Sequence, residues 1–188
     1  IDLFIVGSDQ VWNKEITGKI AFAYFFDFLN DLELNRISYA ASFGSSSWGF
    51  SKNENKIINN LLNQFKSISV RETNAIDMLS SNVNITNAVQ VLDPSLLLDN
   101  LDHLVKKSNF KSLEKYVFVF SFYKQFTPSD LKFIKDRFGL NIKIFSYNLK
   151  YIYDKDYITH YTLSPLDFIK IINDSEFIIT DSYHASIT

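Results

Sequence analysis

The residues best suited to chemistry near the end of the chain are Ser182 and His184, which follow an apolar run at residues 176–180. The run predicts a short buried strand, and Asp181 and Ser182 are residue types that commonly begin a helix. His184 is then expected in the first helical turn at the carboxyl end of a strand, where parallel α/β sheets bind ligands. A histidine there can hold a phosphate or transfer a proton. The alternative is that His184 only caps or packs.

Arg71 has an equivalent place in the first half of the chain, because it follows a predicted strand at residues 67–70 and precedes a predicted helix at residues 73–80. Its planar guanidinium offers a fork of donors that fits a carboxylate or a phosphate. An ion pair with Glu72 or another acid would instead give Arg71 a structural role. The position of Arg71 leaves both interpretations open.

A polar turn follows the first predicted strand, at residues 2–6. Gly7 permits a tight turn, and Asp9 and Gln10 then lie where a ligand would bind at a strand end. Trp12 comes shortly after them, and a tryptophan beside a polar turn favours a binding role. The alternative is an ordinary strand-to-helix turn with an aspartate cap.

The elements that must position these residues alternate between strands and helices on both sides of residue 100, which predicts an α/β fold with two Rossmann-like parallel-sheet units. We expect the units at residues 1–98 and 99–188, with residues 99–114 as the crossing between them. The aromatic segment at residues 21–29 is expected to be a strand or a buried hairpin arm. The serine-rich loop at residues 42–47 would let the backbone approach a phosphate or a sugar. Further strands are predicted at residues 36–42, 89–92, 116–122 and 141–145, and further helices at residues 51–65, 129–138 and 165–172.

The composition narrows the classes of function. The chain of 188 residues is 46% hydrophobic and 21% charged, and its formal net charge of −2 gives no indication of a nucleic-acid partner. The absence of cysteine excludes disulfides, cysteine-ligated zinc and thiol catalysis, and we expect neither a metal nor a cofactor. No apolar run is long enough to predict an integral membrane segment. Because Ile1 and Thr188 fall inside predicted elements, we expect a chain truncated at both ends.

Five motifs, taken together, resemble the polysaccharide pyruvyl transferase family and occur in the family's order. They are FIVGSDQVWN at residues 4–13, ISYAASFG at 37–44, SVRE at 69–72, VLDPS at 91–95 and DSYH at 181–184. The resemblance implies a two-domain fold like that of the GT-B glycosyltransferases. It also implies transfer of a pyruvyl group from phosphoenolpyruvate to a sugar of a cell-surface polysaccharide or its precursor, which forms a pyruvate ketal.

The resemblance extends to individual residues, partners and location. It implies catalysis by Arg71 and His184, which also bind the donor together with Ser182. Position relative to the motifs suggests Asp9, Gln10 and Trp12 as the acceptor-binding residues, with Trp12 stacked on a sugar face. The partners would be phosphoenolpyruvate and a glycan or lipid-linked oligosaccharide. The location would be cytoplasmic, with peripheral association at the inner face of the membrane.

Two other functions are also compatible with the sequence. A GT-B nucleotide-sugar glycosyltransferase would use the same arginine and histidine to hold a nucleotide diphosphate. An inactive glycan-binding relative is the second alternative, because Ala185 stands where the family usually has glycine. Folds of this kind support many functions, so the expected architecture does not choose between them.

Overall fold

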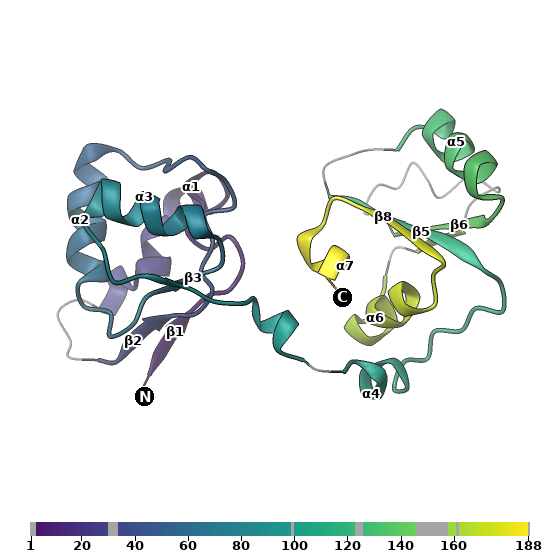
Figure 1. Cartoon of the computed structure of the whole chain (residues 1–188), viewed down its shortest axis with the longest axis horizontal. Helices are drawn as coiled ribbons and strands as arrows, with labels where there is room; N and C mark the ends of the chain where they lie inside the picture. The colour runs from purple at the N-terminus through teal and green to yellow at the C-terminus, as the bar shows by residue number, and fades with distance from the viewer. Residues whose placement is uncertain are drawn as a thin grey trace. The chain divides into compact units, whose positions relative to one another are not determined.

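The computed structural model describes residues 3–29, 34–98, 100–122, 126–145, 158–160 and 162–187. It forms two compact units, Ile1–Leu97 and Leu98–Thr188, each with its own strands and helices (Figure 1). Every described strand pair is parallel. The predicted mixed α/β class with parallel sheets is therefore confirmed.

The first unit contains two parallel strand pairs. They are β1 (Phe4–Val6) with β2 (Arg36–Ser38), and β3 (Ser69–Val70) with β4 (Val89–Gln90). Parallel bridges from Ile37 to Ser67 and from Ala41 to Val70 connect the second strand of one pair to the first strand of the other. Because parallel strands end at the same edge, the segments after β1, β2, β3 and β4 are brought close together.

The helices of the first unit correct one prediction. They are α1 (Lys14–Thr17), η1 (Gly18–Phe25), η2 (Asp27–Leu29), α2 (Lys52–Leu62), α3 (Thr73–Val83) and η3 (Pro94–Leu97). The aromatic segment at residues 21–29 was expected to be extended, but it forms the 3₁₀ helices η1 and η2. Ala21, Phe25, Phe26 and Leu29 are the buried apolar residues of this segment. A short apolar run alone does not separate a helix from a strand.

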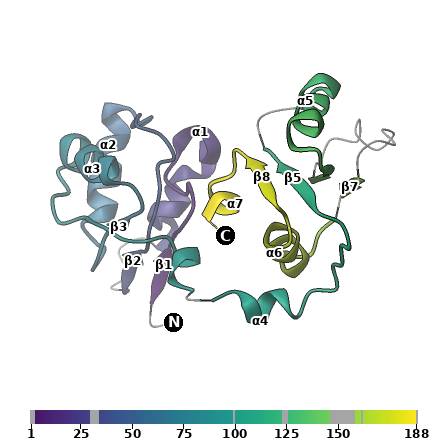
Figure 2. The same ribbon diagram turned by 45° about the vertical axis from the view of Figure 1, so that its right-hand side comes forward.

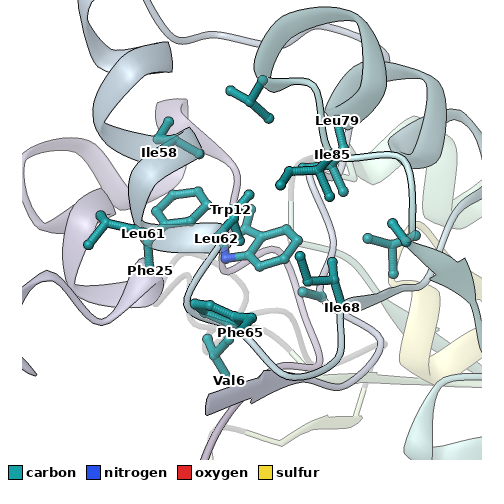
Figure 3. Close-up of a cluster of buried hydrophobic side chains, with 14 of the residues drawn as sticks. Val6, Trp12, Phe25, Ile58, Leu61, Leu62, Phe65, Ile68, Leu79 and Ile85 are labelled. Atoms are coloured by element: carbon teal, nitrogen blue, oxygen red, sulfur yellow. The ribbon is translucent and has the colours of Figure 1, made fainter. Parts of the chain in front are cut away.

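The core of the first unit lies between its strands and the helices α2 and α3 (Figure 3). The predicted amphipathic helix at residues 51–65 is present as α2, which buries Ile58, Leu61 and Leu62. Its start is defined by a capping box, in which Ser51 and Glu54 each bind the other's backbone N–H. Trp12 lies inside this core beside Phe25.

The second unit contains a parallel sheet in the order β7-β6-β5-β8. Its strands are β5 (Tyr116–Phe120), β6 (Asn141–Phe145), β7 (Ile158–His160) and β8 (Phe177–Thr180). All of β5 is buried, as expected for a central parallel strand. Strand β7 was not predicted from the sequence. Strand β8 was expected to be buried, but Phe177 is 48% exposed because β8 is the last strand on its side of the described sheet.

Helices cover both faces of this sheet, and Figure 2 shows α5 (Pro128–Phe138) and α6 (Pro165–Asn173) on opposite sides of β5. Side chains alternate along β5: Phe118 packs in the cluster that contains Ile171 of α6, whereas Val119 packs in the cluster that contains Leu131 of α5. Two shorter helices complete the unit, α4 (Asp102–Val105) and α7 (Tyr183–Ile187). Within the part of the chain that is described, no helix has the length and apolarity needed to cross a membrane.

Candidate functional site

A polar cluster in the first unit is centred on Arg71, which directly follows β3. Its Nη2 donates to Ser42 Oγ at 3.0 Å, and its Nη1 donates to Asp93 Oδ2 at 3.4 Å. Arg71 Nη1 also lies 3.9 Å from Asp9 Oδ1. The Arg71 side chain is only 11% exposed, so these contacts restrict its direction. The structure thus places Arg71 directly after a strand, where ligand-binding residues of a parallel sheet are expected.

Asp93 is the most deeply buried acid of this cluster, with its side chain 1% exposed. Burial raises its pKa, but the Ser95 backbone N–H and the side chains of Ser95, Ser8 and Arg71 lower it, and the net pKa is below the ordinary value of 3.8. Asp93 is thus held as a carboxylate. This anion fixes one side of the Arg71 guanidinium.

Glu72 connects Arg71 to the loop after β2. Its Oε1 accepts hydrogen bonds from the Phe43 N–H at 2.7 Å, the Ser42 hydroxyl at 3.0 Å and the Gly44 N–H at 3.3 Å. Its Oε2 lies 3.8 Å from Arg71 Nε. The loop at residues 42–47 was expected to offer backbone donors to a phosphate or a sugar. The Phe43 N–H is already taken by Glu72, and the Gly44 N–H is shared between Glu72 and Ser42 Oγ, which accepts from it at 2.9 Å.

Asp9 and Gln10 lie in the turn after β1, beside the same cluster. The Asp9 side chain is 70% exposed and is accessible to a ligand. Gly7 has φ +130°, and a Cβ there would lie 1.9 Å from the Tyr39 carbonyl oxygen, so the turn requires glycine. The Gln10 amide oxygen accepts from Asn13 Nδ2 at 2.8 Å. Gln10 therefore stabilises the turn, whereas Asp9 presents a carboxylate at its surface.

Trp12 requires a correction, because the structure places it in the hydrophobic core. Its side chain is fully buried, and its ring stacks on Phe25 with centroids 5.2 Å apart. Phe43 lies against it at 5.6 Å, and its indole N–H donates to the Tyr24 carbonyl at 3.0 Å. No ring face is open to a sugar, so the expected stacking role is wrong. A tryptophan beside a polar turn anchors that turn to the core here.

The second candidate group lies in the other unit, where β8 leads into α7. Ser182 is buried and its Oγ accepts from the Ala185 N–H at 3.3 Å, so Ser182 caps the helix. His184 is half-buried in the first turn of α7 and contacts the Tyr183 ring edge-on at 5.3 Å. Asp181, the other expected cap residue, instead accepts from the Ser121 hydroxyl at 2.5 Å and the Phe122 N–H at 2.9 Å. It thereby joins the ends of β8 and β5.

The structure thus brings Arg71 and Asp9 together in one unit and Ser182 and His184 together in the other. Sequence reasoning assigned no role to Ser42, Asp93 or, beyond a possible ion pair, Glu72. The signal available for them was position, since Ser42 ends one predicted strand, Asp93 directly follows another and Glu72 is adjacent to Arg71. Among the described residues, no group of three or more histidines and acids is arranged to hold a metal ion.

Comparison with known proteins gave a match to a family model over the whole sequence. The sequence model described as polysaccharide pyruvyl transferase matches residues 1–188. Neither the curated proteins nor the solved structures gave a match.

Proposed function

We propose, given that the chain belongs to the polysaccharide pyruvyl transferase family, that it transfers a pyruvyl group from phosphoenolpyruvate to a sugar of a cell-surface glycan or its lipid-linked precursor. The observation that carries the proposal is the family match over residues 1–188. The family name is that of a transferase. A nucleotide-sugar glycosyltransferase and an inactive glycan-binding protein are less well supported, because no separate observation favours either of them.

The proposed reaction forms a cyclic ketal from two sugar hydroxyls. The oxygen of the first hydroxyl bonds to the central carbon of phosphoenolpyruvate, and the proton of that hydroxyl passes to a base. A proton is delivered to the methylene carbon, so the carbon–carbon double bond becomes a single bond and the methylene becomes a methyl group. The oxygen of the second hydroxyl then bonds to the same carbon, the carbon–phosphate oxygen bond breaks, and the second hydroxyl's proton leaves with inorganic phosphate. One proton donor and one hydroxyl-orienting base are sufficient for these steps.

We assign the proton-donor role to His184 and donor binding to His184, Ser182 and Arg71. His184 is half-buried in the first turn of α7, and an imidazole is the side chain that most often transfers protons in enzymes. Ser182 contributes by capping this turn, which orients the backbone that carries His184. This assignment lets His184 either protonate the methylene carbon or assist the departure of phosphate.

Asp9 and Gln10 are assigned to the acceptor, and the charge of the Arg71 cluster supports this for Asp9. One guanidinium and the three carboxylates of Asp9, Glu72 and Asp93 give 1 − 3 = −2. The exposed carboxylate of Asp9 can accept hydrogen bonds from sugar hydroxyls, whereas the guanidinium of Arg71 is the cationic group that can meet an acidic group of the donor. Arg71 therefore contributes to donor binding through the direction of its fork more than through net charge.

The proposal includes the architecture and location that the family resemblance implies. The two parallel-sheet units would form a GT-B-like enzyme, with the acceptor turn in the first unit and the histidine in the second. We place the reaction in the cytoplasm, with peripheral association at the inner face of the membrane. No further cofactor is needed to balance the reaction.

The decisive experiment incubates the full-length protein with phosphoenolpyruvate and a panel of glycans and lipid-linked oligosaccharides. Release of phosphate that depends on the acceptor, together with a product that carries a pyruvate ketal by mass spectrometry and NMR, is the expected result. Nucleotide sugars are supplied in a parallel arm. Glycosyl transfer in that arm, without reaction of phosphoenolpyruvate, would overturn the proposal in favour of a glycosyltransferase.

A further inference from the structure

Glu72 occupies an unusual position for its side chain. It is the N-cap residue of α3, with extended backbone angles of −109° and 142°, yet its side chain makes no capping hydrogen bond. Asp, Ser, Thr and Asn are the residues that normally fill this place, because their short side chains reach back to the helix N–H groups. The longer Glu72 side chain turns away from α3 and reaches the loop after β2.

The Glu72 contacts form a continuous connection to Arg71. Glu72 Oε1 accepts from the hydroxyl of Ser42 at 3.0 Å, and the same Ser42 oxygen accepts from Arg71 Nη2 at 3.0 Å. Hydrogen bonds from the Phe43 and Gly44 N–H groups hold the carboxylate in place, at 2.7 Å and 3.3 Å. Bonds to a charged acceptor are stronger than neutral ones, and more so where water is partly excluded. The Ser42 hydroxyl is therefore oriented with its proton toward Glu72 and its lone pair toward Arg71.

We infer that Glu72 is a positioning residue, which holds residues 42–44 against the guanidinium of Arg71 and sets the direction of its donor fork. Asp93 constrains Nη1 of the guanidinium, while the connection through Ser42 constrains Nη2. With both ends constrained, the fork is oriented before a ligand arrives, which lowers the entropy lost on binding. The effect of this positioning on the binding of phosphoenolpyruvate rests on the proposed function. The link between Glu72 and the guanidinium does not.

The link is tested first without any substrate, by NMR of the full-length protein with ¹⁵N-labelled arginine. The Arg71 Nε–H resonance is identified by its loss in Arg71→Lys. In Glu72→Gln this resonance should move and exchange faster with water, because the charge facing Nε is gone. Glu54→Gln, in which a structural acid that pairs with Lys14 is changed, should leave the resonance in place. An unchanged Arg71 resonance in Glu72→Gln would overturn the inference, whatever the protein's activity.

The consequence for the reaction is tested by steady-state kinetics of the same variants. Glu72→Ala should raise the KM for phosphoenolpyruvate about tenfold, as expected for the loss of a charge-assisted interaction, with a smaller change in kcat. Glu72→Gln should lie between Glu72→Ala and the wild type, because its amide oxygen still accepts from the loop. Glu54→Gln should keep the wild-type KM. A wild-type protein with no pyruvyl transfer would contradict the proposed function, whereas an active wild type and an unchanged KM in Glu72→Ala would contradict the positioning role.

Discussion

Arg71 is constrained by a hydroxyl on one side and a buried carboxylate on the other, so the shape of its side chain matters as well as its charge. Ser42 and Asp93 bind different nitrogens of the guanidinium. The two interpretations of Arg71, ligand binding and a structural ion pair, are both compatible with the structure. The ion pairs with Asp93, Glu72 and Asp9 are present, and the position at the end of β3 is suited to a ligand. Substitution separates the two.

The first prediction is that Arg71→Lys raises the KM for phosphoenolpyruvate roughly tenfold or more, because an ammonium group keeps the charge but loses the planar fork. Arg71→Ala should raise it further. The measurement is steady-state kinetics of the full-length enzyme with saturating acceptor. If both variants keep the wild-type KM and kcat, Arg71 is only a structural ion-pair partner.

His184 is expected to affect the chemical step more than binding. We predict that His184→Asn, which keeps a hydrogen-bonding side chain but cannot transfer a proton, lowers kcat by ~10²–10⁴-fold. The affinity for phosphoenolpyruvate, measured by calorimetry, should fall much less. Near-normal kcat in His184→Asn would exclude acid–base catalysis and leave His184 with a packing or hydrogen-bonding role.

At the element scale, the start of α2 shows how local sequence and a distant contact combine. The capping box of Ser51 and Glu54 is encoded within four residues, but Lys14 lies in α1 and binds Glu54 at 2.6 Å. The hydrogen bond from Lys14, followed by those from Ser51, lowers the Glu54 pKa from 4.5 to about 2. The start of α2 is thereby attached to α1.

This attachment predicts a pH-dependent stability. Because the pKa of Glu54 is depressed in the folded state, its contribution to the free energy of unfolding is fully present above pH 4.5. This contribution is lost as the pH falls towards about 2. Glu54→Gln should lower the free energy of unfolding by about 1 kcal/mol at neutral pH, since the pair is partly exposed and screened. Urea denaturation at a series of pH values should show this difference shrinking in acid. A stability difference between Glu54→Gln and the wild type that is independent of pH would contradict the role given to Glu54. The control is Asp77→Asn, which changes an acid on the exposed surface of α3.

At the scale of the whole molecule, each unit has its own hydrophobic core. The first unit buries one large cluster that includes Trp12, Phe25 and Leu79. The second buries separate clusters on the two faces of its sheet, one of them around Leu131. Separate cores commonly unfold as separate cooperative units.

We therefore predict that a substitution in the core of one unit lowers the stability of that unit and leaves the stability of the other unchanged. Both tryptophans of the chain, Trp12 and Trp48, lie in the first unit, so their fluorescence reports on that unit alone. Leu79→Ala should shift the fluorescence-detected urea transition, at a cost of about 2–5 kcal/mol. Leu131→Ala should shift only the transition seen by circular dichroism. Equal shifts of fluorescence in both variants would show that the units unfold together.

Elements whose signals are local could be predicted from the amino-acid sequence. The helix at α2 follows from apolar spacing and a Ser51 cap, and α6 follows from Ser164 and Pro165 at its start. The short strands β3 and β8 were also predicted, the first from Ser67-Ile68-Ser69-Val70 and the second from an apolar run at residues 176–180. The prediction placed Arg71 and His184 shortly after these strands. These features depend on interactions within a few residues, so a single sequence contains the information.

Features that depend on residues distant in sequence became visible only in the folded chain. Trp12 is a core residue because Phe25 and Phe43 enclose it, and its neighbours in sequence gave no indication of that. The 3₁₀ helices at residues 18–29 replaced the expected extended segment because packing selects between two local structures of similar propensity. The grouping of Ser42, Glu72 and Asp93 around Arg71 joins segments that are far apart in the sequence. Only the pairing of parallel strands brings such segments to one edge of a sheet.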